Sequence, residues 1–314
     1  MLRTFFLSLL LLCSLAHAQG DPWQALKQAY DASHNLNYQG VLQAQHLKDV
    51  KSMEITHAKY GDETYTRINL LDGEPNEILT KGKSTIVYGS TDDNVVIQKR
   101  DANHLFPAIL PNSTEQLKQV YQLNFGKVDR VADRKAQIVV LMPNDDYRFF
   151  YHFWLDKQTS IPLKMIVSDH NNQVVEQTSF TKVKILEKTD LAWFKPNIDL
   201  SKKYVMKEEE SIPSNLPRYW EIKQIPKGFK EVSSKVSRIG GPNILNHHMV
   251  FSDGLAYISL FIQPLTKGQK PKVGNATMGV TNVSARYENG YQIMAVGSVP
   301  IKTVETFSNA VNFN

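Results

Sequence analysis

Cysteine is almost absent from this sequence. Its 314 residues include a single cysteine, Cys13, which lies near the start of the chain. The rest of the chain therefore excludes a disulfide scaffold, a zinc site built on thiolates and a catalytic cysteine. Also missing are a Gly-x-Ser-x-Gly nucleophile elbow, a phosphate-binding loop, a Gly-x-Gly-x-x-Gly fingerprint and a His-Glu-x-x-His zinc motif. We therefore expect no enzymatic activity, no cofactor and no metal.

No apolar run in the sequence is long enough to span a membrane. The longest lies near the N-terminus. Arg3 precedes an apolar run from Phe5 to Leu15, and Ala16-His17-Ala18 has the small-x-small pattern of a cleavage site. This order predicts a secretory signal peptide at residues 1–18, because a run of this length is shorter than the ~20 residues that span a bilayer. A lipoprotein signal at Cys13 is the alternative, which Leu12 disfavours because a small residue is expected there. We expect a mature protein outside the cytoplasm.

The composition is that of a folded protein, with 42% hydrophobic and 21% charged residues. Asp21-Pro22 is a helix start, and Trp23, Leu26 and Tyr30 recur at helical spacing, which predicts a helix over 22–34. Short segments of strand character follow at intervals of about ten residues, interrupted by one predicted helix over 114–122. This spacing indicates a wrapped antiparallel sheet with helices over 19–206.

A second, smaller domain is predicted after a linker. Residues 207–217 combine a charge run with spaced prolines, which is typical of an exposed linker. Residues 218–314 show six predicted strands, with Asp253-Gly254 and Asn289-Gly290 as hairpin turns, and Pro300 opens a terminal helix. The fold class is therefore α+β, with a large domain over 19–206 and a small antiparallel-sheet domain over 218–314.

Two segments of the large domain depart from an ordinary strand pattern. The first runs from Leu105 through Phe106, Ile109 and Leu110, is bracketed by prolines, and is too apolar for a solvated loop. It is either a plug in the core or a flap over an apolar cavity. The second is a strand near 147–156 that carries aromatic residues on both faces, which predicts that both faces are covered.

Charge separates the two halves. Residues 19–206 carry 23 basic and 23 acidic residues, whereas residues 218–314 carry 11 basic and 5 acidic residues, a net charge of +6. A basic domain attracts acidic partners or anionic surfaces, and outside the cytoplasm nucleic acid is the weaker candidate. The alternative is that these lysines and arginines only keep the domain soluble.

Three residue pairs resemble functional sites without supporting one. His247-His248 cannot hold one metal ion, because neighbouring residues of a strand point to opposite faces. Asp92-Asp93 and Asp145-Asp146 lie next to asparagine in turn contexts, where aspartate is favoured for its hydrogen bonds to the backbone. We interpret both carboxylate pairs as structural.

Several segments in order along the chain resemble the RseB/MucB family. They are Leu36-Asn37-Tyr38-Gln39-Gly40, Leu70-Leu71-Asp72-Gly73-Glu74-Pro75-Asn76-Glu77-Ile78, Ile225-Pro226-Lys227-Gly228-Phe229, the stretch from Met249 to Ile262, Asn282-Val283-Ser284-Ala285-Arg286, Gly290-Tyr291-Gln292-Ile293 and Val296-Gly297-Ser298-Val299-Pro300. The resemblance covers essentially the whole chain after the signal peptide. Ser298 departs from it, since an acidic residue is expected before Val-Pro.

The resemblance implies a periplasmic negative regulator of the sigma-E (AlgU) envelope stress response. It implies a large domain like LolA and LolB, an unclosed antiparallel β-barrel with helices. It also implies binding to the periplasmic domain of a membrane-spanning RseA/MucA-type anti-sigma factor, which is thereby protected from regulated proteolysis and keeps the protein at the inner membrane. Lipopolysaccharide or another acylated ligand would release the anti-sigma factor from the complex. Whether the protein also forms a homo-oligomer is left open.

On this basis we assign candidate residues to two sites. Lipid-binding candidates are the segment residues Leu105, Phe106, Ile109 and Leu110 and the strand residues Phe149, Tyr151 and Phe153. Partner-binding candidates are Arg218, Arg238 and Arg286, because a guanidinium group can hold a carboxylate with two hydrogen bonds. A periplasmic lipid or lipoprotein carrier of LolA type is the alternative function, and an enzyme acting on the envelope is a third.

Overall fold

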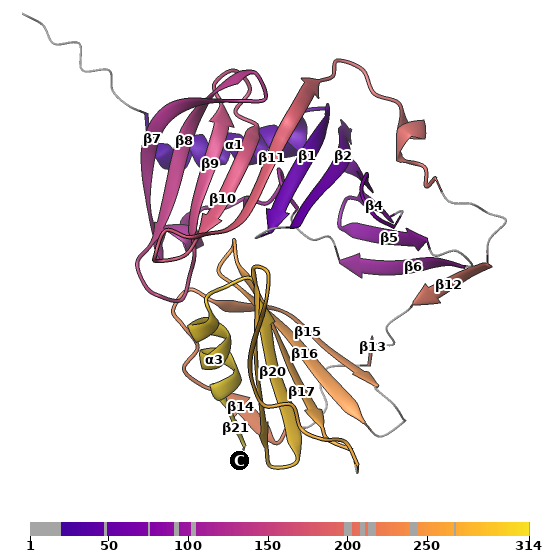
Figure 1. Ribbon diagram of the computed structural model, residues 1–314, viewed down its shortest axis with the longest axis vertical. Coiled ribbons are helices and arrows are strands. Elements are labelled where there is room, and N and C mark those ends of the chain that lie inside the picture. The colour runs from indigo at the N-terminus through magenta and orange to yellow at the C-terminus, as the bar shows by residue number, and fades with distance from the viewer. Residues whose placement is uncertain are drawn as a thin grey trace, which may run out of the picture.

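The computed structural model contains two sheet domains, one above the other in Figure 1. It describes residues 20–46, 49–74, 76–90, 94–101, 105–197, 203–207, 211–212, 218–238, 244–266 and 268–313. The predicted signal peptide at 1–18, the pair Asp92-Asp93 and most of the predicted linker at 207–217 lie outside the described residues. The predicted fold class is confirmed: both sheets are mostly antiparallel, and a helix follows the last long strand of the small domain.

The large domain is built on a twelve-stranded sheet in the order β12-β6-β5-β4-β3-β2-β1-β11-β10-β9-β8-β7. Its strands are β1 (Tyr38–His46), β2 (Asp49–Tyr60), β3 (Glu63–Leu70), β4 (Asn76–Lys81), β5 (Ser84–Ser90), β6 (Asn94–Asp101), β7 (Tyr121–Val131), β8 (Arg134–Pro143), β9 (Phe150–Asp156), β10 (Pro162–Ser168), β11 (Val174–Ile185) and β12 (Lys203–Lys207). Among the strands that the structure describes, the edge strands β7 and β12 do not pair, so the barrel is unclosed. All neighbours are antiparallel except β12 and β6.

Helix α1 (Pro22–Asn35) lies against one face of this sheet (Figure 1). The predicted start is confirmed, since an Asp21 carboxylate oxygen accepts a hydrogen bond from the Trp23 amide at 2.9 Å. Leu26 and Ala29 are fully buried in the core of the domain. Burying a leucine side chain stabilises a fold by about 2 kcal/mol, so this face of the helix holds it to the sheet.

The predicted helix over 114–122 is shorter than expected. Helix α2 covers Glu115–Lys118 only, and β7 begins at Tyr121. Leu117, Val120 and Tyr121 are all buried in the core. Apolar residues at positions 117, 120 and 121 fit a short helical turn followed by a strand as well as they fit one longer helix. Periodicity alone therefore could not distinguish a short helix from a long one.

The small domain is a seven-stranded sheet in the order β13-β15-β16-β17-β20-β19-β18. Its strands are β13 (Ser211–Ile212), β15 (Lys230–Arg238), β16 (Leu245–Ser252), β17 (Tyr257–Pro264), β18 (Gly274–Met278), β19 (Thr281–Glu288) and β20 (Tyr291–Gly297). A separate pair is formed by β14 (Trp220–Ile222) and β21 (Val311–Phe313). Helix α3 (Ile301–Asn309) packs on one face of the sheet through Val304 and Phe307, which are fully buried, as its predicted apolar stripe requires.

Candidate functional site

The segment over 105–110 packs into the core of the large domain. Phe106 and Leu110 are buried, Ile109 is half-buried, and Leu105 is exposed. The Phe106 ring lies 5.9 Å from that of Phe180 on β11. In this structure the segment is therefore a plug, which is the first of the two predicted alternatives.

Aromatic residues of β9, and Phe149 just before it, are also part of the core. Phe149, Tyr151 and Phe153 are buried, and the rings of Tyr151 and Phe153 are stacked at 6.3 Å. Burial raises the pKa of Tyr151 far above its ordinary value, so its hydroxyl stays protonated. All three residues therefore lie inside the domain, and their role in lipid binding stays a prediction.

The other face of β9 is covered by polar side chains of neighbouring strands. The Trp154 indole donates a hydrogen bond to Asp129 of β7 at 2.9 Å, and the ammonium group of Lys164 on β10 lies 4.9 Å from the centre of the ring. The hydrogen bond from Trp154 is the main reason why the pKa of Asp129 is lowered from its ordinary value. Aromatic residues on both faces of this strand thus have two different environments.

Strands β2 to β6 form what we call the wing, and an apolar surface continues from the core onto β2 to β5. Ile55 and Ile68 pair across β2 and β3 and are buried in the core. The same register continues to Ile78 on β4 and Val87 on β5, and both are only half-buried. Met53 and Leu70 form a second half-buried pair beside them. This inner wing surface is the accessible apolar part of the unclosed barrel.

This surface was not predicted from the sequence, although the alternation of apolar residues along β2 and β3 carried a signal for it. Met53 and Ile55 lie two positions apart, as do Ile68 and Leu70, so each pair shares a face of its strand. The opposite face is partly covered by the segment after β11. Arg67 forms an ion pair with Glu77 at 2.5 Å and donates a hydrogen bond to the Trp193 carbonyl at 3.1 Å. The connecting segment therefore occupies the outer side of the wing and leaves the inner side open.

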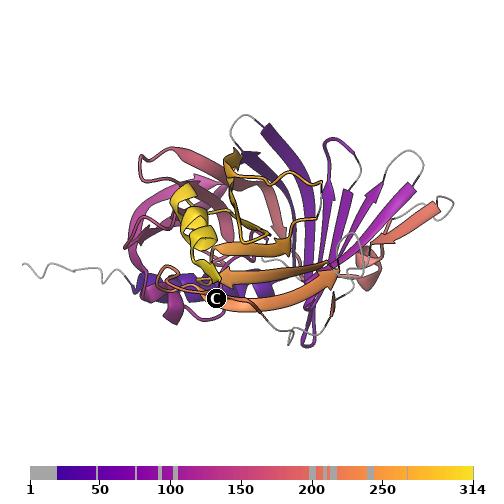
Figure 2. The same ribbon diagram turned by 90° about the horizontal axis from the view of Figure 1, so that it is seen from below.

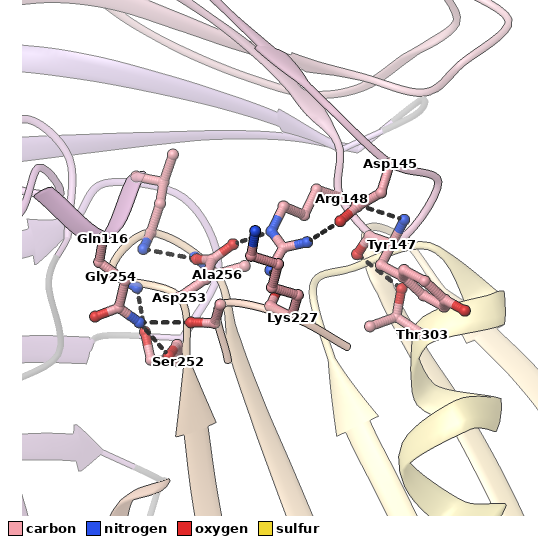
Figure 3. A network of polar contacts seen from close by, with 12 residues as sticks. Gln116, Asp145, Tyr147, Arg148, Lys227, Ser252, Asp253, Gly254, Ala256 and Thr303 are labelled. Carbon is pink, nitrogen blue, oxygen red and sulfur yellow. Dashed lines mark hydrogen bonds and ion pairs between the residues drawn. The ribbon is translucent and has the colours of Figure 1, made fainter. Parts of the chain in front are cut away.

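The two domains meet at a polar joint centred on Arg148, whose side chain is fully buried (Figure 3). Its guanidinium group donates to Asp253 at 2.7 Å, to Asp145 at 2.5 Å and to the Lys227 carbonyl at 2.5 Å. Asp145 belongs to the large domain, whereas Asp253 and Lys227 belong to the small one. The guanidinium carbon also lies 4.6 Å from the centre of the Phe229 ring. All three nitrogens of the buried cation thus have an acceptor.

Further hydrogen bonds extend the joint on both sides of Arg148. The Gln116 amide donates to the Gly228 carbonyl at 2.7 Å and to the Ser252 carbonyl at 2.9 Å. On the other side, the Thr303 hydroxyl donates to the Tyr147 carbonyl at 2.8 Å (Figure 3). These bonds link α2 and the 145–148 turn to the hairpin turn before β17 and to α3.

An exposed ion pair lies at the rim of the joint. Lys302 of α3 contacts Asp146 at 3.1 Å. The hydrogen bond from Lys302 lowers the pKa of Asp146, and the same bond raises the pKa of Lys302. Both aspartates of the Asp145-Asp146 pair are therefore structural, as predicted, but they join the domains in addition to shaping a turn.

Apolar contacts complete the joint. Leu255 and Val280, which belong to the small domain, are buried in the core of the large one. Gly228 has a φ of +89°, and a Cβ atom there would lie 2.6 Å from a methyl group of Val120. A side chain at position 228 would therefore collide with the large domain in a backbone conformation that L-residues rarely adopt.

The three candidate arginines lie in different surroundings. Arg218 is exposed, donates to the Ser234 hydroxyl at 3.1 Å and lies over the Trp220 ring. Arg238 is exposed at the end of β15. Arg286 is half-buried and donates to the Ser308 carbonyl at 2.7 Å and to the Val311 carbonyl, so it holds the end of α3 to the sheet. The structure does not bring the three together.

The described ranges hold neither a metal-binding cluster nor a membrane-spanning helix. Within those residues, no three His, Cys, Asp or Glu side chains are grouped so that they could hold a metal ion. None of the helices described is both long enough and apolar enough to cross a membrane. His247 packs against Trp220, whereas His248 stacks on Phe261, which confirms that this pair faces opposite ways.

Comparison with known proteins matches both halves of the chain to domains of the same family. Residues 21–198 match the MucB/RseB N-terminal domain, and residues 214–312 match the MucB/RseB C-terminal domain. The chain is 24% identical over 307 residues to the sigma-E factor regulatory protein RseB of Haemophilus influenzae, covering 97% of this chain and 95% of that protein. It is 25% identical to the sigma factor AlgU regulatory protein MucB of Pseudomonas aeruginosa, covering 92% and 89%.

Solved structures share the two-domain fold. A crystal structure of MucB in complex with MucA(peri) superposes with a TM-score of 0.74 at 21% identity, covering 94% of this chain and 99% of that one. The Pseudomonas aeruginosa MucA/MucB complex gives a TM-score of 0.75 at 22% identity, covering 94% and 99%. The relatives are named for regulation rather than for catalysis.

Proposed function

The chain belongs to the MucB/RseB family, and from this we propose that it is a periplasmic negative regulator of a sigma-E-type envelope stress response. It binds the periplasmic domain of an RseA/MucA-type anti-sigma factor and protects that domain from regulated proteolysis. The observation that carries the proposal is the match of both domains, in order, to a family in which MucB is known in complex with MucA(peri). In this proposal the protein is exported, has no catalytic role, and stays at the inner membrane through its partner.

The large domain is the proposed sensor of lipopolysaccharide or another acylated ligand. The inner wing surface supports this role, because Met53, Leu70, Ile78 and Val87 expose apolar area next to the core. Each methylene buried there contributes ~0.8 kcal/mol, so a few methylenes would bias the arrangement of the domains. For a longer chain to enter, the plug from Leu105 to Leu110 would have to move, which keeps the flap hypothesis for Phe106 and Ile109.

A double substitution tests the flap part of this proposal. Phe106→Asp/Ile109→Asp should weaken binding of a fluorescent fatty acyl probe, measured by titration, while circular dichroism checks the fold. Unchanged probe binding by a folded variant would refute the flap. A substitution on the outer side of the wing, Leu79→Asp, is the matched control, because Leu79 lies on the face opposite Ile78.

The small domain is the proposed binding part for the anti-sigma factor, because it carries the net charge of +6. Arg218 and Arg238 are exposed and suited to carboxylates of the partner. Arg286 is a poorer choice for substitution, because its loss would also release the carbonyls at the end of α3. If the affinity for the anti-sigma factor changes neither with Arg218→Ala nor with ionic strength, the electrostatic part of the proposal is refuted.

The joint is the element through which ligand binding in one domain would change partner binding by the other. A ligand shifts such an equilibrium only if it binds the two domain arrangements with unequal affinity. The Leu117 to Tyr121 region packs in the large core and also lies against Gly228, so it connects the two domains physically.

Affinity capture from detergent-solubilised membranes of the source organism tests the proposal as a whole. The mature protein, residues 19–314, is the bait, and an unrelated exported protein is the control. Recovery of an RseA/MucA-type anti-sigma factor with the bait alone is the expected result. Recovery of lipids or lipoproteins without an anti-sigma factor would instead favour the LolA-type carrier, which would then transfer bound lipid between vesicles.

A further inference from the structure

The segment after β11 carries a short helical turn that presents apolar side chains to solvent. This turn is the 3₁₀-helix η1 (Leu191–Phe194). Leu191 is 48% exposed and Trp193 is 39% exposed. Phe194 of the same turn packs inward on the wing, since its ring lies 5.6 Å from that of Tyr65 on β3. In Figure 1 and Figure 2 the turn, drawn in salmon, lies beside the wing, at the end of the large domain opposite β7.

An ion pair of the wing pins the backbone of this turn. Arg67 and Glu77 are paired at 2.5 Å in a mostly buried position. Arg67 also donates a hydrogen bond to the Trp193 carbonyl at 3.1 Å, and Glu77 accepts one from the Asn197 amide at 2.9 Å. Both bonds go to the backbone, so they fix the turn without using the indole ring. The Trp193 side chain is therefore held on the outside by contacts in which it takes no part.

Four exposed lysines lie before and after the turn. They are Lys182, Lys184, Lys188 and Lys195. The two on β11 point to the outer side of the sheet, because Val183 and Ile185, which alternate with them, pack on the core. The strand register places Lys184 in one row with Arg67 across β11, β1, β2 and β3. The lysines of β11 therefore share the side of the sheet on which η1 lies.

Charge indicates what this surface contacts. Residues 181–197 carry four lysines and two acidic residues, a net charge of +2, whereas residues 19–206 together are neutral. Among the residues that the structure describes, none forms an ion pair with any of the four lysines. One of the two acidic residues, Asp190, caps η1 by accepting a hydrogen bond from the Ala192 amide at 2.8 Å. The ammonium groups are therefore available to an anionic surface.

The kind of anionic surface follows from the apolar side chains. Tryptophan is enriched where a protein meets the headgroups of a membrane, because its ring is apolar and its N–H is polar. Lysines beside it attract anionic lipids. A stable protein interface buries about 1,000 Å² or more, and two apolar side chains on one turn are few for that. A lipid surface is therefore favoured over a protein partner.

We propose that residues 181–197 form a docking surface for a bilayer of anionic phospholipids. Leu191 and Trp193 enter the headgroup region, and the four lysines lie at the lipid phosphates. The contact is peripheral, and it lies on the outer side of the sheet, opposite the inner wing surface. It needs neither an acylated ligand nor the anti-sigma factor, and it gives the protein a direct contact with the membrane in addition to the proposed one through its partner.

The test measures the partitioning of the purified mature protein onto vesicles by cosedimentation. Vesicles of phosphatidylglycerol mixed with phosphatidylethanolamine supply the anionic surface, and vesicles of phosphatidylcholine supply a neutral one. Both are free of lipopolysaccharide. We expect binding to the anionic vesicles that weakens as salt is added, and much weaker binding to the neutral ones.

Two variants test the two parts of the surface. Trp193→Ser should weaken partitioning at least about fivefold, because it removes the apolar anchor and keeps the backbone bond to Arg67. Lys184→Glu/Lys188→Glu should weaken it at least about tenfold, since each lysine near an anionic surface contributes about fivefold. The matched controls are Tyr219→Ser, an exposed aromatic residue of the small domain, and Lys135→Glu/Lys157→Glu, two exposed lysines near β7. Both controls should stay within about twofold of the wild type.

Each outcome supports or overturns the inference without reference to the anti-sigma factor. Thermal unfolding first checks that every variant is folded, and Leu191→Ser provides a second position if Trp193→Ser is not. The inference is overturned if the wild type does not bind anionic vesicles, binds neutral ones equally well, or loses no more binding in the two variants than in the controls.

Two further results would assign the surface or the lipid contact elsewhere. If Ile78→Glu on the inner wing surface abolishes vesicle binding while Trp193→Ser does not, the lipid enters at the proposed acyl site and the inference is wrong. If Trp193→Ser leaves vesicle binding unchanged but weakens binding of the anti-sigma periplasmic domain, the turn is a protein interface, which also overturns the inference.

Discussion

Asp253→Asn is predicted to break the joint while sparing the turn that carries it. One Asp253 oxygen accepts hydrogen bonds from the Leu255 amide at 3.0 Å and the Ala256 amide at 2.8 Å, and the other accepts from Arg148. Asparagine keeps the first acceptor but turns an NH2 group toward the Arg148 donor. Removing one partner of a buried ion pair costs about 3–5 kcal/mol, because the other charge stays buried. Arg148 retains Asp145 and the Lys227 carbonyl, so we expect a loss of about 3 kcal/mol.

Urea unfolding followed by tryptophan fluorescence measures this effect. Trp220 is the only tryptophan in residues 218–314, so Trp220→Phe isolates the large domain in the same assay. We expect Asp253→Asn to lower the unfolding midpoint and to separate the transitions of the two domains. Asp146→Asn at the exposed pair with Lys302 is the control and should change little, because exposed pairs contribute little to stability.

A double mutant decides whether the ion pair itself is responsible. Arg148→Met/Asp253→Asn removes both buried charges, so its cost should fall below the sum of the single costs by at least about 1 kcal/mol. Additive costs, or a loss below about 0.5 kcal/mol for Asp253→Asn alone, would refute the reasoning.

Three further predictions concern the large domain. Ile78→Glu should abolish binding of a fluorescent acyl probe with little loss of stability, and unchanged probe binding would remove the inner wing surface from the ligand site. Phe153→Ala should lower the free energy of unfolding by about 3–5 kcal/mol, measured in urea, and a loss below ~1 kcal/mol would mean that β9 is not part of a packed core. Burial lowers the pKa of His57 to about 4 from 6.5, so the neutral ring stabilises the fold above pH 6.5 and up to ~3 kcal/mol is lost as the pH falls toward 4. That part of the pH dependence should disappear in His57→Gln, and equal pH dependence of both proteins would contradict it.

Local chemistry made several elements predictable from the sequence. Asp21-Pro22 specified the start of α1, because its cap requires only neighbouring residues. Asp253-Gly254 marked a hairpin turn, since an aspartate followed by glycine satisfies the turn amides by itself. The apolar stripe after Pro300 likewise predicted α3.

Long-range contacts were not predictable in the same way. Arg148 and Asp253 are 105 residues apart, and nothing in either neighbourhood indicates the other. Strand β18 was missed because all five of its residues are exposed and show no alternation. Phe149, Tyr151 and Phe153 were rightly expected to be inside, but apolarity alone does not tell a wall of a binding site from a solid core.

The parallel pairing of β12 with β6 gives the small domain two attachments at separate places. β12 ends at Lys207 on the far edge of the wing, and β13 begins at Ser211 in the other sheet, only three residues later (Figure 1). Closure of the joint is therefore an intramolecular event with a high effective concentration, so individually modest contacts suffice to keep it shut.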